Sequence, residues 1–150
     1  MALPTEFTAA DAVSLYTDFF ADFDRTKANA MLADLHLNQH DRIGAMSKGM
    51  QEKMQLCLTM SRAAKLYLLD EPLGGVAPAA REYILNTILH NYSEDAALVL
   101  STHLIGDIEK VLDEVIFLKD GSVMRQVGVD ELREETGTSV DAYFREAYKC

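Results

Sequence analysis

An acidic pair, Asp70-Glu71, follows a short apolar run at residues 66–69 of this 150-residue sequence. A continuous apolar run between helical patterns predicts a strand that is buried on both faces. Carboxylates at the end of such a strand cost free energy unless they have partners. Asp70 suits the water shell of Mg²⁺, which prefers one or two carboxylates together with phosphate oxygens. Glu71 suits orienting and deprotonating a water for attack on a phosphoryl group. A solvated strand end is the simpler alternative.

Two further segments carry groups that suit phosphate chemistry. His103 comes shortly after a second apolar run, 97–100, and is a candidate to hydrogen-bond a γ-phosphate and the attacking water. A lone histidine in this place is also compatible with a purely structural role. Ser47, Lys48 and Gly49 stand where a helical pattern begins, and backbone amides at a helix start favour anions such as phosphate. The alternative there is an ordinary serine N-cap.

The first third of the chain is predicted to be helical. Thr8 and Asp11 form an acidic variant of the capping box, and Asp24 is placed to cap a second helix. Four aromatic residues after Thr8 recur at helical spacing and predict one core-facing stripe. They are Tyr16, Phe19, Phe20 and Phe23.

From residue 46 onward the pattern changes to alternating helices and apolar runs. A helix after Ser47 has an apolar face that includes Cys57, and another helix begins near Pro78. A short helix follows His103, with Leu104, Ile108, Val111 and Leu112 on one side. A further strand at 115–118 leads through the Asp120-Gly121 turn signal into 122–127. One amphipathic helix near 140–148 ends the chain. This order predicts an α/β fold with a mostly parallel sheet and a C-terminal hairpin.

The ordered set of motifs resembles the ATP-binding cassette (ABC) transporter ATPases. Residues 46–50 (Met-Ser-Lys-Gly-Met) lie where that family carries its signature, usually Leu-Ser-Gly-Gly-Gln. Residues 65–72 are similar to its Walker B strand with the catalytic glutamate, and 74–78 to its D-loop. Residues 101–103 (Ser-Thr-His) resemble its switch-histidine segment, and 118–121 its Leu-x-x-Gly hairpin. Each motif alone is weak, but their order and spacing are specific.

The resemblance implies a partial P-loop NTPase fold, a Mg²⁺-ATP cofactor and a role for each site residue. Asp70 would position Mg²⁺, Glu71 would be the general base, and His103 would sense the γ-phosphate. Ser47, Lys48 and Gly49 would contact the γ-phosphate of ATP bound to an opposite subunit. The implied domains are a helical subdomain at 1–48, the C-terminal half of the ATPase core at 49–127 and a helical tail at 128–150. The signature variant resembles a bacterial subset linked to peptide-antibiotic or multidrug export.

Three departures from the family pattern affect this expectation. Lys48 and Met50 replace the usual glycine and glutamine of the signature, and Ala77 stands where the D-loop usually has aspartate. The phosphate-binding loop, Gly-x-x-x-x-Gly-Lys-Ser/Thr, does not occur in these 150 residues. We therefore expect a fragment that alone binds ATP poorly, hydrolyses it negligibly and self-associates through exposed sheet edges.

Composition and charge limit the classes of function that this sequence can have. The formal net charge of −10 argues against a nucleic-acid partner. No apolar run is long enough to span a bilayer, and two cysteines favour a reducing compartment. Cys57 is expected to be a core hydrophobe, and His36, His40 and His90 to be surface or packing residues.

The expected partners are a second ATPase subunit in a head-to-tail dimer and a transmembrane permease. The protein would then be cytoplasmic and attached to the inner face of the membrane through that permease. Two other classes of function remain open. One is a non-catalytic interaction or regulatory module, favoured by Ala77 and the missing loop, and the other is a soluble ABC ATPase of translation or DNA repair.

Overall fold

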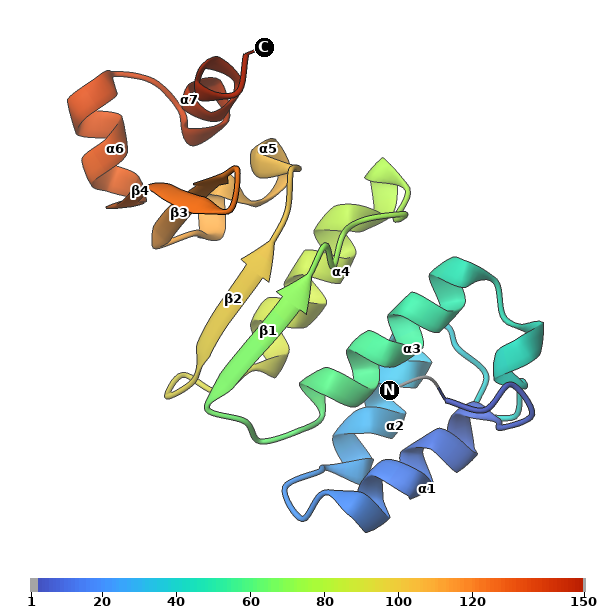
Figure 1. Cartoon of the computed structure of the whole chain (residues 1–150). Helices are drawn as coiled ribbons and strands as arrows, with labels where there is room; N and C mark the ends of the chain where they lie inside the picture. Colours follow the sequence, from blue (N-terminus) through green and yellow to red (C-terminus); the bar gives the residue numbers. More distant parts are fainter. Residues whose placement is uncertain (1–2, 150) are drawn as a thin grey trace. The chain divides into compact units, whose positions relative to one another are not determined.

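The computed structural model describes residues 3–149. The chain forms two compact units, and the boundary between them lies between Thr102 and His103 in the sequence. The first unit contains a group of helices followed by two strands with a helix between them. The second unit contains short helical turns, a β-hairpin and two helices (Figure 1). The predicted order, helices first and strand–helix alternation afterwards, is confirmed.

Three α-helices open the first unit, and their starting points follow from local capping. They are α1 (Ala9–Phe19), α2 (Arg25–Asp34) and α3 (Lys48–Met60), with a 3-10 turn, η1 (Ile43–Ala45), before α3. Thr8 and Asp11 form the predicted capping box, with Asp11 N donating to Thr8 Oγ1 at 3.2 Å and Thr8 N donating to the Asp11 carboxylate at 2.9 Å. Asp24 caps α2 by accepting from Lys27 N at 2.9 Å. Both predicted helix starts are therefore confirmed.

The predicted aromatic stripe is only partly present. The Tyr16 ring contacts the rings of Phe20 and Phe23, with centroids 5.2 and 5.6 Å apart. Phe19 is 73% exposed, so its predicted place in the core was wrong. The reason is that α1 ends at Phe19 and the backbone at Phe20 becomes extended. Phe20 and Phe23 then reach Tyr16 from outside the helix.

The core of the helical group is formed by buried side chains of α1, α2 and α3. Ala28, Met31 and Leu32 of α2 are almost fully buried. Cys57 of α3 has no exposed surface, and burial raises the pKa of its thiol to about 12. A thiol with such a pKa stays protonated at neutral pH and is inert. The prediction that Cys57 is a core hydrophobe is confirmed, and His36, His40 and His90 are exposed.

Two parallel strands follow the helical group, as predicted. β1 (Leu66–Asp70) and β2 (Ala97–Ser101) pair in register, and α4 (Pro78–Asn91) connects them and lies along the pair (Figure 1). Pro78 occupies the first turn of α4, where its missing N–H costs nothing.

The prediction that these strands are buried on both faces was wrong. Tyr67 and Leu69 are 3% and 9% exposed, whereas Leu68 is 68% and Val99 is 49% exposed. Side chains of a strand alternate between the two faces, and within the described residues β1 and β2 form a sheet of two strands with one open face. The run of apolar residues indicated that both faces of the sheet are covered. Whether another element packs on a face depends on the tertiary structure, and here one face is open.

The second unit is built around a hairpin. α5 (Ile105–Ile108) and the 3-10 turn η2 (Glu109–Val111) precede β3 (Glu114–Lys119) and β4 (Ser122–Gly128), which pair antiparallel. Asp120 and Gly121 both have positive φ, 50° and 75°, which is the conformation of a type I′ hairpin turn. The hairpin prediction is confirmed. Val111 was expected to face inward but is 41% exposed, because α5 ends at Ile108 and the chain continues as a tighter 3-10 turn.

Two helices end the described chain, and the second of them is the predicted amphipathic helix. They are α6 (Val129–Thr136) and α7 (Val140–Ala147). Gly137 ends α6 with a left-handed φ of 66°, and Ser139 caps α7 by accepting from Ala142 N at 3.1 Å. The hydrophobic core of this unit consists of Ile105, Val115, Phe117, Val127, Val129, Leu132 and Val140. In the described part of the chain, no helix has both the length and the apolar character needed to cross a bilayer.

Candidate functional site

The carboxyl end of β1 brings two of the predicted site residues together with a third polar residue. Asp70 is the last residue of β1, and Ser101, the last residue of β2, lies opposite it in the parallel register. The Ser101 hydroxyl donates to Asp70 Oδ1 at 2.5 Å. Because the carboxyl ends of parallel strands share one sheet edge, polar groups from two chain segments meet here.

A tight turn immediately follows β1 and sets the position of Glu71. Glu71 has a left-handed φ of 45°, which is uncommon for a non-glycine residue. Its N–H donates to the Ser101 carbonyl at 3.0 Å, and its own carbonyl accepts from Gly74 N at 2.8 Å. The side chain is half-buried, and its Oε2 atom is enclosed. Leu73, 1% exposed, anchors the turn in the core.

Ser47, Lys48 and Gly49 form the start of α3. Ser47 is the N-cap and accepts from Met50 N at 3.3 Å. The side chain of Lys48 is 90% exposed, and its Nζ lies 3.8 Å from Glu52 Oε1. A Cβ atom added at Gly49 would meet nothing within 4 Å. The first turn of α3 therefore presents backbone N–H groups and the exposed Lys48 side chain on the surface.

Glu52 connects the start of α3 with the loop after β1. A Cβ atom built on Gly75 would lie 3.1 Å from Glu52 Oε2, and Gly75 has φ 72°. Gly75 thus combines a left-handed backbone with close approach to a carboxylate. Figure 1 shows the start of α3 and the end of β1 at the same end of the first unit.

The structure does not join every predicted residue into this arrangement. His103 opens the second compact unit, and its side chain is exposed. Its relation to Asp70 and Glu71 stays a prediction. Two residues near the site, Ser101 and Glu52, were not singled out from the sequence for these contacts. The sequence placed Ser101 after the second apolar run and in the 101–103 segment, but it did not predict its contact with Asp70.

An open hollow of ≈ 230 Å³ lies beside the acidic strand end, on the exposed side of the two strands. It is lined by Leu68, Leu69, Asp70, Val99 and Ser101. Mg²⁺ in nucleotide sites is held by one or two carboxylates together with phosphate oxygens. An exposed carboxylate held by one hydrogen bond beside a hollow fits that requirement.

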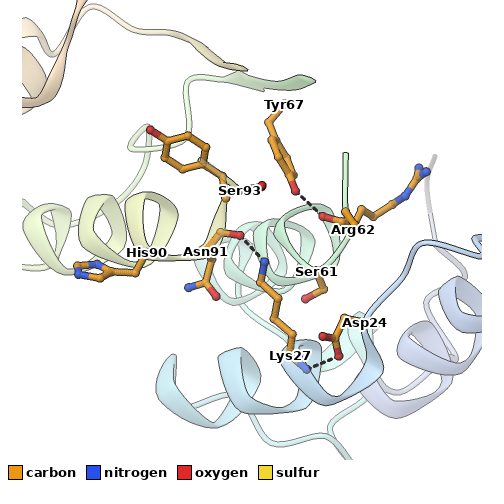
Figure 2. A pocket seen from close by; sticks show the side chains of 10 residues that line it. Asp24, Lys27, Ser61, Arg62, Tyr67, His90, Asn91 and Ser93 are labelled. Carbon is orange, nitrogen blue, oxygen red and sulfur yellow. Dashed lines mark hydrogen bonds between the residues drawn. The ribbon is translucent and has the colours of Figure 1, made fainter. Parts of the chain in front are cut away.

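Another pocket, of ≈ 250 Å³, lies where the ends of α3 and α4 approach α2 (Figure 2). Its cationic groups already have partners within the protein. Lys27 donates to the backbone carbonyl of Asn91, and Arg62 pairs with Asp22 at 2.8 Å. Burial lowers the pKa of Lys27, although the nearby Asp24 opposes the shift. We interpret this pocket as a structural junction that ties α2 to α4.

Comparison with known proteins shows which family this chain resembles. The family model for ABC transporters matches residues 3–74. The ABC transporter ATP-binding protein YtrB of Bacillus subtilis (strain 168) is 27% identical over 131 residues, which cover 87% of this chain and 45% of YtrB. The uncharacterized ABC transporter ATP-binding protein YxlF of the same organism is 31% identical over 106 residues, which cover 71% of this chain and 36% of YxlF.

A solved structure shows the same fold. The ATP-binding subunit of an ABC transporter superposes with a TM-score of 0.84 over 99% of this chain and 65% of its own, at 24% identity. The fold is therefore that of a P-loop NTPase cassette. The chain carries part of an ABC ATPase domain, and it spans less than half the length of the two relatives described above.

Proposed function

We propose that this chain is the portion of an ABC transporter ATPase that carries the signature helix and the acidic strand end, and that the complete ATPase hydrolyses ATP to ADP and phosphate. The observation that carries the proposal is the strand end itself. Asp70 and Glu71 leave β1 at the edge where Ser101 holds them, beside an open hollow. The start of α3 lies at the same end of the unit (Figure 1).

In the proposed reaction each residue has one task. Asp70 helps to hold Mg²⁺, which, when bound, neutralises charge on the phosphate oxygens. Glu71 orients a water and accepts its proton as the water attacks the γ-phosphoryl group. Ser47, Lys48 and Gly49 contact the γ-phosphate of ATP held mainly by the opposite subunit, and His103 donates a hydrogen bond to that phosphate. The displacement is direct, and no covalent intermediate forms on the protein.

The proposal extends to domains, partners and location. Residues 1–48 would be the helical subdomain, 49–127 the C-terminal half of the ATPase core and 128–150 a helical tail. Two ATPase subunits would dimerise head to tail and drive a transmembrane permease, which would hold them at the cytoplasmic face of the membrane. The Ser-Lys-Gly-Met signature favours bacterial export of peptide antibiotics or drugs as the transport task.

Phosphate release tests the proposed function. We expect residues 1–150 alone to release phosphate from Mg-ATP at the background rate, because the loop that cradles the β- and γ-phosphates is absent from this segment. The native gene product that contains these residues is expected to hydrolyse ATP if it also carries that loop. A folded product with the loop but without hydrolysis would contradict the proposal. A product that consists of residues 1–150 alone would instead favour an interaction or regulatory module.

We also propose that copies of residues 1–150 associate through the β1–β2 sheet. Leu66, Leu68 and Val99 are 51%, 68% and 49% exposed on its open side. In the described part of the chain, the sheet has two strands, so each strand has an outer edge that can pair with another chain.

Sedimentation measures this association. The unmodified segment is expected to sediment as a dimer or larger species at micromolar concentrations, and Leu68→Lys to shift it towards the monomer. Phe19→Lys is the matched control, because Phe19 is 73% exposed but lies on α1. A compact monomer of the unmodified segment across the micromolar range would overturn the idea.

A further inference from the structure

Ser101 makes an unusual combination of contacts at the proposed site. Its hydroxyl donates to Asp70 Oδ1 at 2.5 Å, while Glu71 N donates both to its Oγ at 3.2 Å and to its backbone carbonyl at 3.0 Å. One residue therefore contacts the side chain of Asp70 and the backbone of Glu71. We propose that Ser101 is a positioning residue, which orients the Asp70 carboxylate towards Mg²⁺. This inference rests on the proposed ATPase function.

The hydrogen-bond chemistry of a hydroxyl allows only one arrangement of these contacts. A serine hydroxyl has one hydrogen to donate and two lone pairs that accept. An ionised carboxylate only accepts, so the hydroxyl hydrogen points to Asp70, and a lone pair accepts the Glu71 N–H. The hydrogen bond to a charged acceptor is of the stronger kind. The Asp70 side chain is exposed, so this hydrogen bond is what restricts rotation of its carboxylate.

The backbone and side-chain contacts of Ser101 can be separated by substitution. The bond from Glu71 N to the Ser101 carbonyl does not depend on the residue type at position 101. Ser101→Ala therefore leaves β1, β2 and the turn at Glu71 in place and removes only the hydroxyl. Ser101→Thr keeps the hydroxyl, and threonine suits a strand position. Because the Ser101 side chain is exposed, an added methyl group does not disturb the core.

Cation affinity in the native gene product tests the inference without relying on turnover. Mn²⁺ serves as the probe, and its affinity is measured by electron paramagnetic resonance in the presence of ADP. Ser101→Ala is expected to weaken Mn²⁺ binding by about 10- to 100-fold, the usual effect of removing a group that orients a metal ligand. Ser101→Thr is expected to restore binding close to the unmodified level. The Mg²⁺ concentration for half-maximal phosphate release should shift in parallel, with a smaller change in kcat.

A second measurement separates this inference from the proposed function. In residues 1–150, the couplings of the Asp70 β-protons report by NMR whether its side chain keeps one rotamer. We expect one rotamer in the unmodified segment and in Ser101→Thr, and averaging in Ser101→Ala. Unchanged couplings in Ser101→Ala, or Mn²⁺ affinity equal to that of the unmodified protein, would overturn the role of Ser101. A failure of the unmodified gene product to bind Mn²⁺-ADP or to hydrolyse ATP, with the couplings as expected, would count against the ATPase proposal instead.

Discussion

Replacing Glu71 by glutamine in the complete ATPase is expected to slow phosphate release by about 100- to 10,000-fold, the usual contribution of a general base. Glutamine keeps the size and shape of the side chain but cannot accept the proton of the attacking water. The turn at Glu71 is held by backbone contacts, from its N–H to Ser101 and from Gly74 N to its carbonyl. The substitution therefore removes the proton acceptor while the surrounding loop keeps its conformation.

Two measurements are needed to interpret Glu71→Gln. Binding of a fluorescent ATP analogue is expected to stay close to the unmodified value, because Glu71 is proposed to act on water rather than on the nucleotide. Glu82→Gln is a matched control, since Glu82 is exposed on α4, and it should hydrolyse ATP normally. If Glu71→Gln also hydrolysed ATP at a near-normal rate, another group would have to be the general base.

The second large effect concerns the stability of the second unit. Glu109 lies in η2 and is 9% exposed. Its Oε1 accepts from Val140 N at 2.9 Å and from Arg133 at 2.9 Å, and its Oε2 accepts from Asp141 N at 3.3 Å. One carboxylate therefore satisfies N–H groups in the first turn of α7 and pairs with a guanidinium on α6.

Glu109→Ala is expected to lower the free energy of unfolding of this unit by about 3 kcal/mol. The loss follows because two N–H groups and the Arg133 guanidinium would be left without this acceptor. Hydrogen exchange of residues 129–149 in urea is the measurement, since it follows α6 and α7 directly. Glu134→Ala is the matched control, because Glu134 is exposed on the same helix as Arg133, and it should change stability by less than about 0.5 kcal/mol.

The same contribution should depend on pH in a defined direction. Burial raises the pKa of Glu109, but the hydrogen bonds from Val140, Arg133 and Asp141 outweigh it, so the pKa lies below the ordinary value of 4.5. A carboxylate with a lowered folded-state pKa adds stability that is fully present above 4.5 and disappears as pH falls through the folded-state value. The difference between unmodified protein and Glu109→Ala should therefore be constant near neutral pH and shrink below pH 4.5. A difference that grew on acidification would contradict this role.

Local features of the fold could be predicted because they depend on residues close together in sequence. The capping box of Thr8 and Asp11, the proline at the start of α4 and the Asp120-Gly121 turn each involve neighbours within one helical turn or one hairpin. An apolar helix face likewise predicted α3, and two continuous apolar runs predicted the parallel pair of strands. The aromatic stripe failed because periodicity did not reveal that α1 ends at Phe19.

The sequence by itself therefore determined the order of elements, the helix starts, the acidic strand end and the resemblance to ABC ATPases. Only the tertiary structure decided which groups meet. Ser101 reaches Asp70 because the parallel register places the ends of β1 and β2 opposite each other. Glu109, in a turn far earlier in the chain, accepts hydrogen bonds from the first N–H groups of α7. The tertiary structure also decided that the sheet face at Leu68 is exposed. Such contacts depend on how whole elements pack, and no pattern within one element encodes the identity of its distant partner.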